Sequence, residues 1–267
     1  MATVIHAERH ETQTSNIIFK GRALLHNKKE VNVYVKDLVL QELINEILVY
    51  IVAKSLNLPV VDSFLGIVDS AKLSLKKAPT ASKNQSFVFL SKISSAKDMK
   101  FHVLSACDKM NKKISEDLLE WLLLGPSLAL DAWVANVDRN LGNILYAGPQ
   151  EFMLIDHGQS FGGPRNWGNA DLGAHKEFDC KLSQIVNKFG ATQAQRKLLQ
   201  DKASETKSDI DKLPIATIIS KLPAIKGMED VDVKRMRNFL EQRIQHILRL
   251  ISHKIRGNEL VQYDGYH

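Results

Sequence analysis

The spacing of the apolar residues changes near residue 92, and this change limits the folds that the chain can adopt. In residues 31–36, valines alternate with polar side chains, which is the pattern of a half-buried β-strand, and Lys36 lies on the face opposite the valines. Residues 38–56 carry the one helical stripe of apolar side chains in the first part, whereas beyond about residue 92 the patterns are mostly helical. Strands therefore dominate the first part of the chain and helices the second, so the sequence predicts a mixed α+β fold.

The same patterns predict the individual elements. Before residue 93 the predicted strands are 16–25, 31–36, 64–68 and 87–90, with one helix at 38–56 and an exposed loop at 69–86. Further on, the predicted helices are 116–135, 179–189, 193–207, 215–222 and 231–255, the last being the longest, and short strands are predicted at 143–146 and 152–155. The Gly125-Pro126 pair interrupts the first of these helices. We predict two domains, residues 1–92 and 93–267.

The composition is that of a globular protein and excludes several classes. Of the 267 residues, 44% are hydrophobic and 25% are charged, which is enough apolar material for a sizeable core and argues against disorder over most of the length. No apolar run approaches the roughly 18 residues of a membrane span, and residues 1–12 are too polar for a signal peptide, so we expect a cytoplasmic protein. Cys107 and Cys180 match no pairing or metal-ligand motif, and we expect two buried thiols.

The net charge of +6 raises the question of a polyanionic partner. Lysines cluster in residues 28–29, 72–83 and 109–113, with no aromatic residues interleaved for base stacking and no nucleic-acid-binding motif nearby. We therefore expect most of these lysines to lie on solvated faces and loops, and we predict neither direct nucleic-acid binding nor membrane binding.

Residues 132–163, AWVANVDRNLGNILYAGPQEFMLIDHGQSFGG, carry the side chains that point to chemistry. Asp138 and Asn143 lie five positions apart on a loop after a predicted buried helix, and Asp156 follows a predicted strand eighteen positions after Asp138. Phosphoryl transfer from ATP needs a carboxylate that orients the attacking hydroxyl and hard oxygen ligands that hold Mg²⁺ against the phosphates. Asp138 suits the first role, and Asn143 and Asp156 suit the second. Gly158 is expected to permit a sharp turn after them.

Two residues further upstream support this interpretation. Lys36, at the end of its predicted strand, would reach the ATP phosphates, and Glu46 on the next helix would hold it by an ion pair. Taken singly, Lys36 reads as a solvated lysine and Glu46 as a surface carboxylate. A strand lysine, a helix glutamate, an aspartate with asparagine five positions later, and Asp-x-Gly after a strand follow in the order that a two-lobed kinase presents them.

The segments VDRNLGNIL and LIDHGQSFGG resemble the catalytic and metal-binding segments of the HipA-like kinases, a branch of the atypical kinases related to the phosphatidylinositol 3- and 4-kinases. EILVYIVAKSLNLP, residues 46–59, is similar to the helix that follows the nucleotide lysine in that family. The resemblance covers roughly residues 16–255. It implies a two-lobed protein-kinase-like α+β fold, with a small β-rich N-lobe over a larger helical C-lobe, ATP in the cleft, and serine/threonine protein phosphorylation as the activity.

Residue by residue, the resemblance implies Asp138 as the catalytic aspartate, Asn143 and Asp156 as metal ligands, and Lys36 with Glu46 as the nucleotide ion pair. The chain departs from kinase patterns in the N-terminal phosphate loop, which has no G-x-G-x-x-G and only Gly21 nearby.

Two other functions remain open at this point. A phosphoinositide kinase should carry more basic residues after Asp156 than Arg165 and Lys176. A nucleotide-binding pseudokinase would serve as an interaction module without turnover. The sequence names neither the protein substrate nor an inhibitory partner protein of the kind that the toxin members of the family have.

Overall fold

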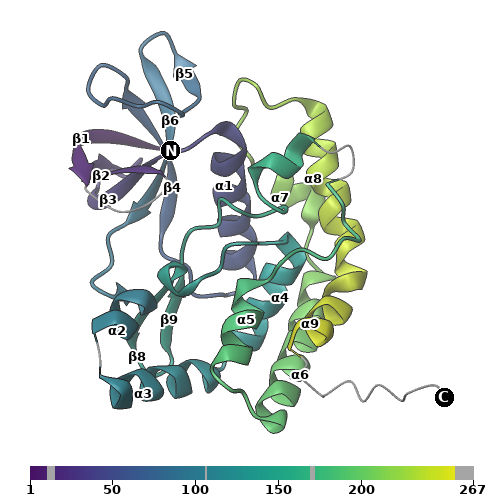
Figure 1. Cartoon of the computed structure of the whole chain (residues 1–267). Helices are drawn as coiled ribbons and strands as arrows, with labels where there is room; N and C mark the ends of the chain where they lie inside the picture. The colour runs from purple at the N-terminus through teal and green to yellow at the C-terminus, as the bar shows by residue number, and fades with distance from the viewer. Residues whose placement is uncertain (11–15, 106, 169–171, 256–267) are drawn as a thin grey trace, which may run out of the picture.

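The computed structural model describes residues 1–10, 16–105, 107–168 and 172–255, and it combines an N-terminal sheet with a helical C-terminal part (Figure 1). The N-terminal strands are β1 (Ala2–His10), β2 (Ile17–Leu24), β3 (Glu30–Asp37), β4 (Ser63–Asp69), β5 (Thr80–Ser82) and β6 (Gln85–Lys92). They pair in the order β3-β2-β1-β4-β6-β5, and a second pairing between β3 and β6 closes all of them except β5 into a ring. Val33 and Val35 of β3 are completely buried inside this ring, so Lys36 on the other face of the strand points out of it.

Helix α1 (Leu40–Ser55) follows β3 and runs between the strands and the C-terminal helices (Figure 1). Its apolar residues, among them Leu43, Ile44 and Leu48, belong to the core of the helical part rather than to the interior of the ring. The helix ends where Asn57 adopts a left-handed conformation, ahead of Pro59. The N-terminal sheet and the helical part thus share α1 as a common support.

The C-terminal helices are α2 (Met99–Ser105), α3 (Asp108–Leu119), α4 (Leu124–Val134), α5 (Lys181–Lys188), α6 (Gln193–Ile210), α7 (Ile215–Ile219), α8 (Asp230–Arg243) and α9 (Ile247–Ile255). The 3-10 helices are η1 (Leu141–Asn143), η2 (Pro164–Gly168) and η3 (Ile244–His246). A second sheet pairs β7 (Lys97–Asp98), β8 (Ile144–Gly148) and β9 (Glu151–Leu154) in that order. Helix α4 is buried nearly all round because it packs against α5, α6, α8 and α9, and the loop that follows it carries Asp138.

Two of the predicted helices are divided. The break within 116–135 precedes Gly125 and Pro126, so that α3 ends at Leu119 and both residues lie in the first turn of α4. Proline is tolerated there because the first N–H groups of a helix have no partner within it. The predicted helix 231–255 is interrupted by η3, so the longest helix of the described residues is α6, with 18 residues, and not the last one.

Some elements lie outside the predicted ones. The sequence patterns missed β1, β5, β7 and α2, and β1 buries only Ala2 and Val4, which is too short an apolar signal to detect. The predicted exposed loop 69–86 contains β5 and is tied down by the buried Asp37 carboxylate, which accepts hydrogen bonds from the backbone N–H groups of residues 76–78. Tertiary pairing therefore stabilises segments that have little local signal.

The two cysteines differ from each other. Cys180 is buried, whereas Cys107 is exposed, which corrects the expectation of two buried thiols, and both are free. Within the residues described above, the helices are all too short or too polar to cross a membrane. Strand β6 ends at Lys92, and the division of the chain into two domains at that point stays a prediction.

Candidate active site

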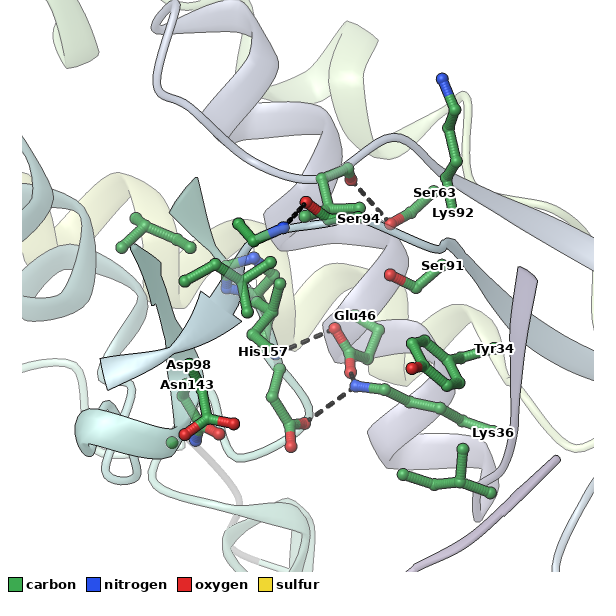
Figure 2. Close-up of a pocket in the computed structure, with 18 of the residues that line it drawn as sticks. Tyr34, Lys36, Glu46, Ser63, Ser91, Lys92, Ser94, Asp98, Asn143 and His157 are labelled. Carbon is green, nitrogen blue, oxygen red and sulfur yellow. Dashed lines mark hydrogen bonds and ion pairs between the residues drawn. The ribbon is translucent and has the colours of Figure 1, made fainter. Parts of the chain in front are cut away.

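Lys36 and Glu46 form a buried ion pair. The strand β3 carries Lys36 on its outer face, and α1 carries Glu46 facing it, with 2.6 Å between Nζ and Oε1 (Figure 2). The Lys36 side chain is 12% exposed and that of Glu46 is 1% exposed, so neither is a solvated surface group. The pairing that the order of motifs predicted is therefore present in the structure.

Asp156 lies on the other side of the same lysine. Its Oδ1 is 3.2 Å from Lys36 Nζ, although 120 residues separate the two in the sequence. The backbone of Asp156, two residues after the end of β9, has a left-handed φ of 60°. Gly158 lies in the turn that follows, which Ser160 N–H closes by donating to the His157 carbonyl at 3.1 Å, as expected. Gly158 does not have a positive φ, and a Cβ at this position would meet Glu42 at an ordinary 3.5 Å, so this turn does not require glycine.

The charges of this group depend on one another. Burial alone would lower the pKa of Lys36, but the carboxylates of Asp156 and Glu46 outweigh it and raise that pKa above its ordinary value. Burial also opposes ionisation of Asp156, and the Lys36 ammonium outweighs it, so that the pKa of Asp156 is lowered. Burial raises the pKa of Glu46 to about 7, against the opposing effect of Lys36. Lys36 and Asp156 consequently stay charged near neutral pH.

Helix α1 holds the segment that follows Asp156. Glu46 Oε2 accepts a hydrogen bond from the backbone N–H of His157 at 2.8 Å. The preceding residue, the completely buried Asn45, donates from Nδ2 to the carbonyl oxygens of Gly158 at 2.8 Å and Ser160 at 2.9 Å. Through these two adjacent residues, α1 fixes both Lys36 and the segment that follows Asp156.

Asp138 and Asn143 come together on the loop after α4. Asn143 Nδ2 donates to the Asp138 backbone carbonyl at 2.6 Å and lies 3.4 Å from its Oδ2. Asn136 Oδ1 accepts from the backbone N–H of Asp138 at 3.0 Å, and Asn140 caps η1 through Gly142 N at 2.8 Å. Because local side chains fill the hydrogen-bonding groups of the loop, the carboxylate has a defined position without strand or helix pairing.

Arg139, which the sequence patterns did not single out, joins this loop to the Asp156 segment. Its side chain is completely buried and forms two bonds of 3.1 Å with the Asp131 carboxylate. It also donates to the backbone carbonyls of Asn143 and Ile155. Arg139 Nη2 lies 2.8 Å from His157 Nδ1, and since a guanidinium can only donate, that imidazole nitrogen accepts. Burial, aided by the Arg139 charge, holds the pKa of His157 well below its ordinary value, so His157 is neutral.

A second residue that the sequence patterns missed contacts Asp138 directly. Lys181, the first residue of α5, forms an ion pair through its Nζ with Asp138 Oδ1. Asn140 Nδ2 is 3.2 Å from the same oxygen. A contact over 43 residues leaves no periodic signal in the sequence, and only the fold brings the two groups together.

A cavity of about 400 Å³ lies beside these groups and is lined from both the N-terminal strands and the second sheet. Four of the five predicted site residues line it, namely Lys36, Glu46, Asn143 and Asp156. Asp138 joins them through its hydrogen bonds with Asn143. The cavity is large enough for a small-molecule ligand, and both cationic and anionic side chains line it.

The comparison with protein families decides the family of this chain. The family model described as HipA-like kinase matches residues 25–254, which is most of the chain. The chain belongs to the HipA-like kinase family. Membership identifies it as a kinase, and the resemblance to this family is confirmed.

A solved structure agrees with this HipA-like assignment. The crystal structure of CtkA, a proinflammatory kinase of Helicobacter pylori, superimposes with a TM-score of 0.55 and 14% identity, over 88% of this chain and 94% of that one. At this identity the similarity shows a shared fold. Among curated protein sequences none matches this HipA-like kinase.

The packing of β1 against β2 explains why this HipA-like kinase has a glycine at position 21. A Cβ at Gly21 would lie 2.1 Å from the backbone oxygen of His6, so β1 and β2 can approach only if residue 21 is glycine. His10 and Tyr34 from the same sheet stack with ring centroids 5.5 Å apart and line the cavity. Gly21 is thus required by strand packing. The segment 11–15 between the two strands lies outside the described residues.

Proposed function

We propose that this HipA-like kinase transfers the γ-phosphate of ATP, with Mg²⁺, to a serine or threonine hydroxyl of a protein. The observation that carries the proposal is the group formed by Lys36, Glu46 and Asp156 in the lining of the cavity. A buried ammonium held by two carboxylates is a preorganised site for phosphate oxygens, because its position and charge are fixed before a ligand arrives.

The proposal includes a two-lobed arrangement. The N-terminal sheet forms the small lobe, the helical part forms the large one, and the nucleotide lies in the cavity that both line. Tyr34, Phe89 and Leu154 supply apolar and aromatic lining for a base, and Lys36 supplies a cation for the phosphates.

The residues present fit Mg²⁺. Asn143 and Asp156 supply an amide oxygen and a carboxylate to the same cavity, and both are hard oxygen donors. In the described residues no three His, Cys, Asp or Glu side chains gather around a common point, which suits an ion that takes few protein ligands and keeps phosphate and water oxygens. Asn143 directs its Nδ2 to Asp138, so its Oδ1 is the atom for the ion. Bound Mg²⁺ would neutralise charge on the phosphate oxygens.

Asp138 is the residue that would orient the acceptor hydroxyl and accept its proton. Its side chain is 33% exposed, so a substrate can reach it, and Asn136 and Asn143 hold its backbone. The acceptor oxygen forms the new bond to the γ-phosphorus, its proton passes to the Asp138 carboxylate, and the bond to the bridging oxygen breaks with its electron pair leaving on ADP.

Nucleotide binding is tested first, by thermal unfolding with and without Mg-ATP. Nucleotide at about 100 times its Kd should stabilise the protein by about 2.7 kcal/mol, and an unchanged midpoint at saturating nucleotide counts against the ATP site. Asp156→Asn should reduce the shift because it removes a charge from the metal site.

Transfer is tested next, with γ-labelled ATP and a cell lysate, followed by identification of the labelled amino acid. Labelled phosphoserine or phosphothreonine supports the proposal. A labelled phosphoinositide would replace it with lipid kinase activity, which the few basic residues between Asp156 and Asp179 disfavour. ATP binding without any transfer would indicate a pseudokinase module.

A further inference from the structure

Lys181 reaches the acceptor end of the site from a different element than the other polar residues. It is the first residue of α5, which lies beside α4 in Figure 1, and its Nζ pairs with Asp138 Oδ1. The neighbours of Lys181 on each side, Cys180 and Leu182, are buried at 9% and 0% exposure. The backbone at Lys181 is therefore fixed while its side chain extends to the carboxylate.

The position of Lys181 is not explained by stability. The N-terminus of a helix carries a partial positive charge, so a lysine in the first turn of α5 is unfavourable by itself. Its pair with Asp138 is partly solvated, with 44% and 33% of the two side chains exposed, and such pairs contribute little to folding. A weak pair in a costly place favours a role in the reaction over one in the fold.

A buried arginine holds the segment that precedes Lys181. Arg243 of α8 is 2% exposed and donates to the backbone carbonyls of Ala174 at 2.7 Å and Lys176 at 2.9 Å, and also to that of Ala132 in α4 at 2.7 Å. These bonds tie the segment before α5 to the helices of the core. The segment thereby brings a cation to Asp138 on a rigid support, as a preorganised site requires.

The chemistry at Asp138 needs such a cation. During transfer, negative charge on the phosphoryl oxygens lies close to the Asp138 carboxylate, and the two repel each other. Lys36 is engaged by Glu46 and Asp156, while Lys181 is in contact with Asp138 itself.

We propose that Lys181 is a further catalytic residue: its ammonium holds Asp138 in the free enzyme and contacts the transferring phosphoryl group once an acceptor hydroxyl takes its place on the carboxylate. This inference rests on the proposed function. The ammonium keeps its proton throughout. The acceptor proton passes to Asp138, the new P–O bond forms, and ADP leaves with the electron pair of the broken bond, while Lys181 offsets charge on the phosphoryl oxygens.

The test compares Lys181→Met and Lys181→Arg with a matched control, Lys188→Met, which removes an exposed lysine from the other end of α5. The first measurement is calorimetric binding of MgADP alone and of MgADP with aluminium fluoride, which mimics a phosphoryl group in transfer. The second is transfer from γ-labelled ATP to myelin basic protein and to water, with kcat and the KM for ATP determined separately.

We expect Lys181→Met to bind MgADP within about two-fold of wild type but to lose at least about ten-fold in affinity for the aluminium fluoride complex. Its kcat should fall by about a hundred-fold with little change in the KM for ATP, and Lys181→Arg should recover a large part because it restores the charge. Lys188→Met should match wild type in every measurement.

Two results would overturn the assignment of Lys181. If Lys181→Met binds the aluminium fluoride complex as wild type does, the ammonium does not contact the transferring group. If the variant transfers phosphate faster than wild type, the pair with Asp138 is an inhibitory contact. A wild-type protein that binds no MgADP would instead overturn the proposed function, and the two failures are therefore distinguishable.

Discussion

Removing Arg139 should test whether the loop of Asp138 and the segment of Asp156 depend on one buried guanidinium. Each N–H group of Arg139 has an acceptor: the two oxygens of Asp131, the carbonyls of Asn143 and Ile155, and Nδ1 of His157. Arg139→Met keeps much of the side-chain volume and removes every one of these bonds.

The expected cost follows from what the change leaves behind. Asp131, at 1% exposure, would become a buried carboxylate without its cation, and breaking a buried pair in this way costs about 3–5 kcal/mol. That is a large share of the total stability of about 5–15 kcal/mol expected for a domain. The second change Asp131→Leu removes the unpaired charge, so the double variant should recover more than half of the loss, with the unpaired carbonyls accounting for the rest.

Urea unfolding of the single and double variants measures these differences at a constant slope. Arg237→Met is the matched control, because Arg237 pairs with Glu241 at 2.7 Å on the surface and its loss should cost no more than about 0.5 kcal/mol. We expect the double variant to regain stability without regaining phosphate transfer, since the link between the two segments stays broken. A loss for Arg139→Met no larger than that of Arg237→Met would refute the reasoning.

Further predictions concern the site residues themselves. Asp156→Asn should weaken both Mg-ATP binding and turnover, whereas Asp138→Asn should leave Mg-ATP affinity within a few-fold and lower turnover by roughly a hundred-fold or more; equal loss of binding in a titration of both would show that the roles are misassigned. Lys36→Met should abolish turnover and destabilise the fold, and adding Glu46→Gln should recover stability in urea but no phosphate transfer; recovery of transfer would contradict a role for Lys36 at the phosphates. Asn45→Ala should cost about 1–3 kcal/mol in urea and raise the Mg²⁺ concentration needed for ATP binding, and an unchanged Mg²⁺ titration would limit Asn45 to a structural role.

Local patterns in the sequence predicted the groups that lie on regular elements. The alternation of β3 placed Lys36 on the face opposite Val33 and Val35, and that face does open into the cavity. The helical stripe of α1 predicted an element that could carry Glu46 toward Lys36, although the buried state of this glutamate could not be deduced from its polar type. Periodicity is sufficient for such residues because side-chain direction follows from the position along the element.

Two of the residues that the sequence patterns missed have partners far away in the chain. Lys181 contacts Asp138, and Asn45 contacts carbonyl groups more than a hundred positions later. A lysine at a helix start and an asparagine inside a helix are locally unfavourable choices, and this was the only signal available. The predicted position of the break between α3 and α4 was also wrong because of a distant contact. Gly125 is needed where α4 approaches Lys202 of α6 closely, and it does not form a turn.

Two buried hydrogen-bond networks hold the residues on both sides of Asp156 and so set its position. Its φ of 60° is a conformation that costs a non-glycine residue about 1 kcal/mol or more, so the surroundings must hold it. From one side, Glu46 and Asn45 of α1 bind the next backbone groups, and from the other side Arg139 binds the preceding carbonyl of Ile155. The Asp156 carboxylate is thus held in place by hydrogen bonds to the neighbouring residues. Its two oxygens remain the atoms that a metal ion would contact. The fold therefore sets the geometry of the proposed metal site before nucleotide arrives, and binding energy need not be used to create it.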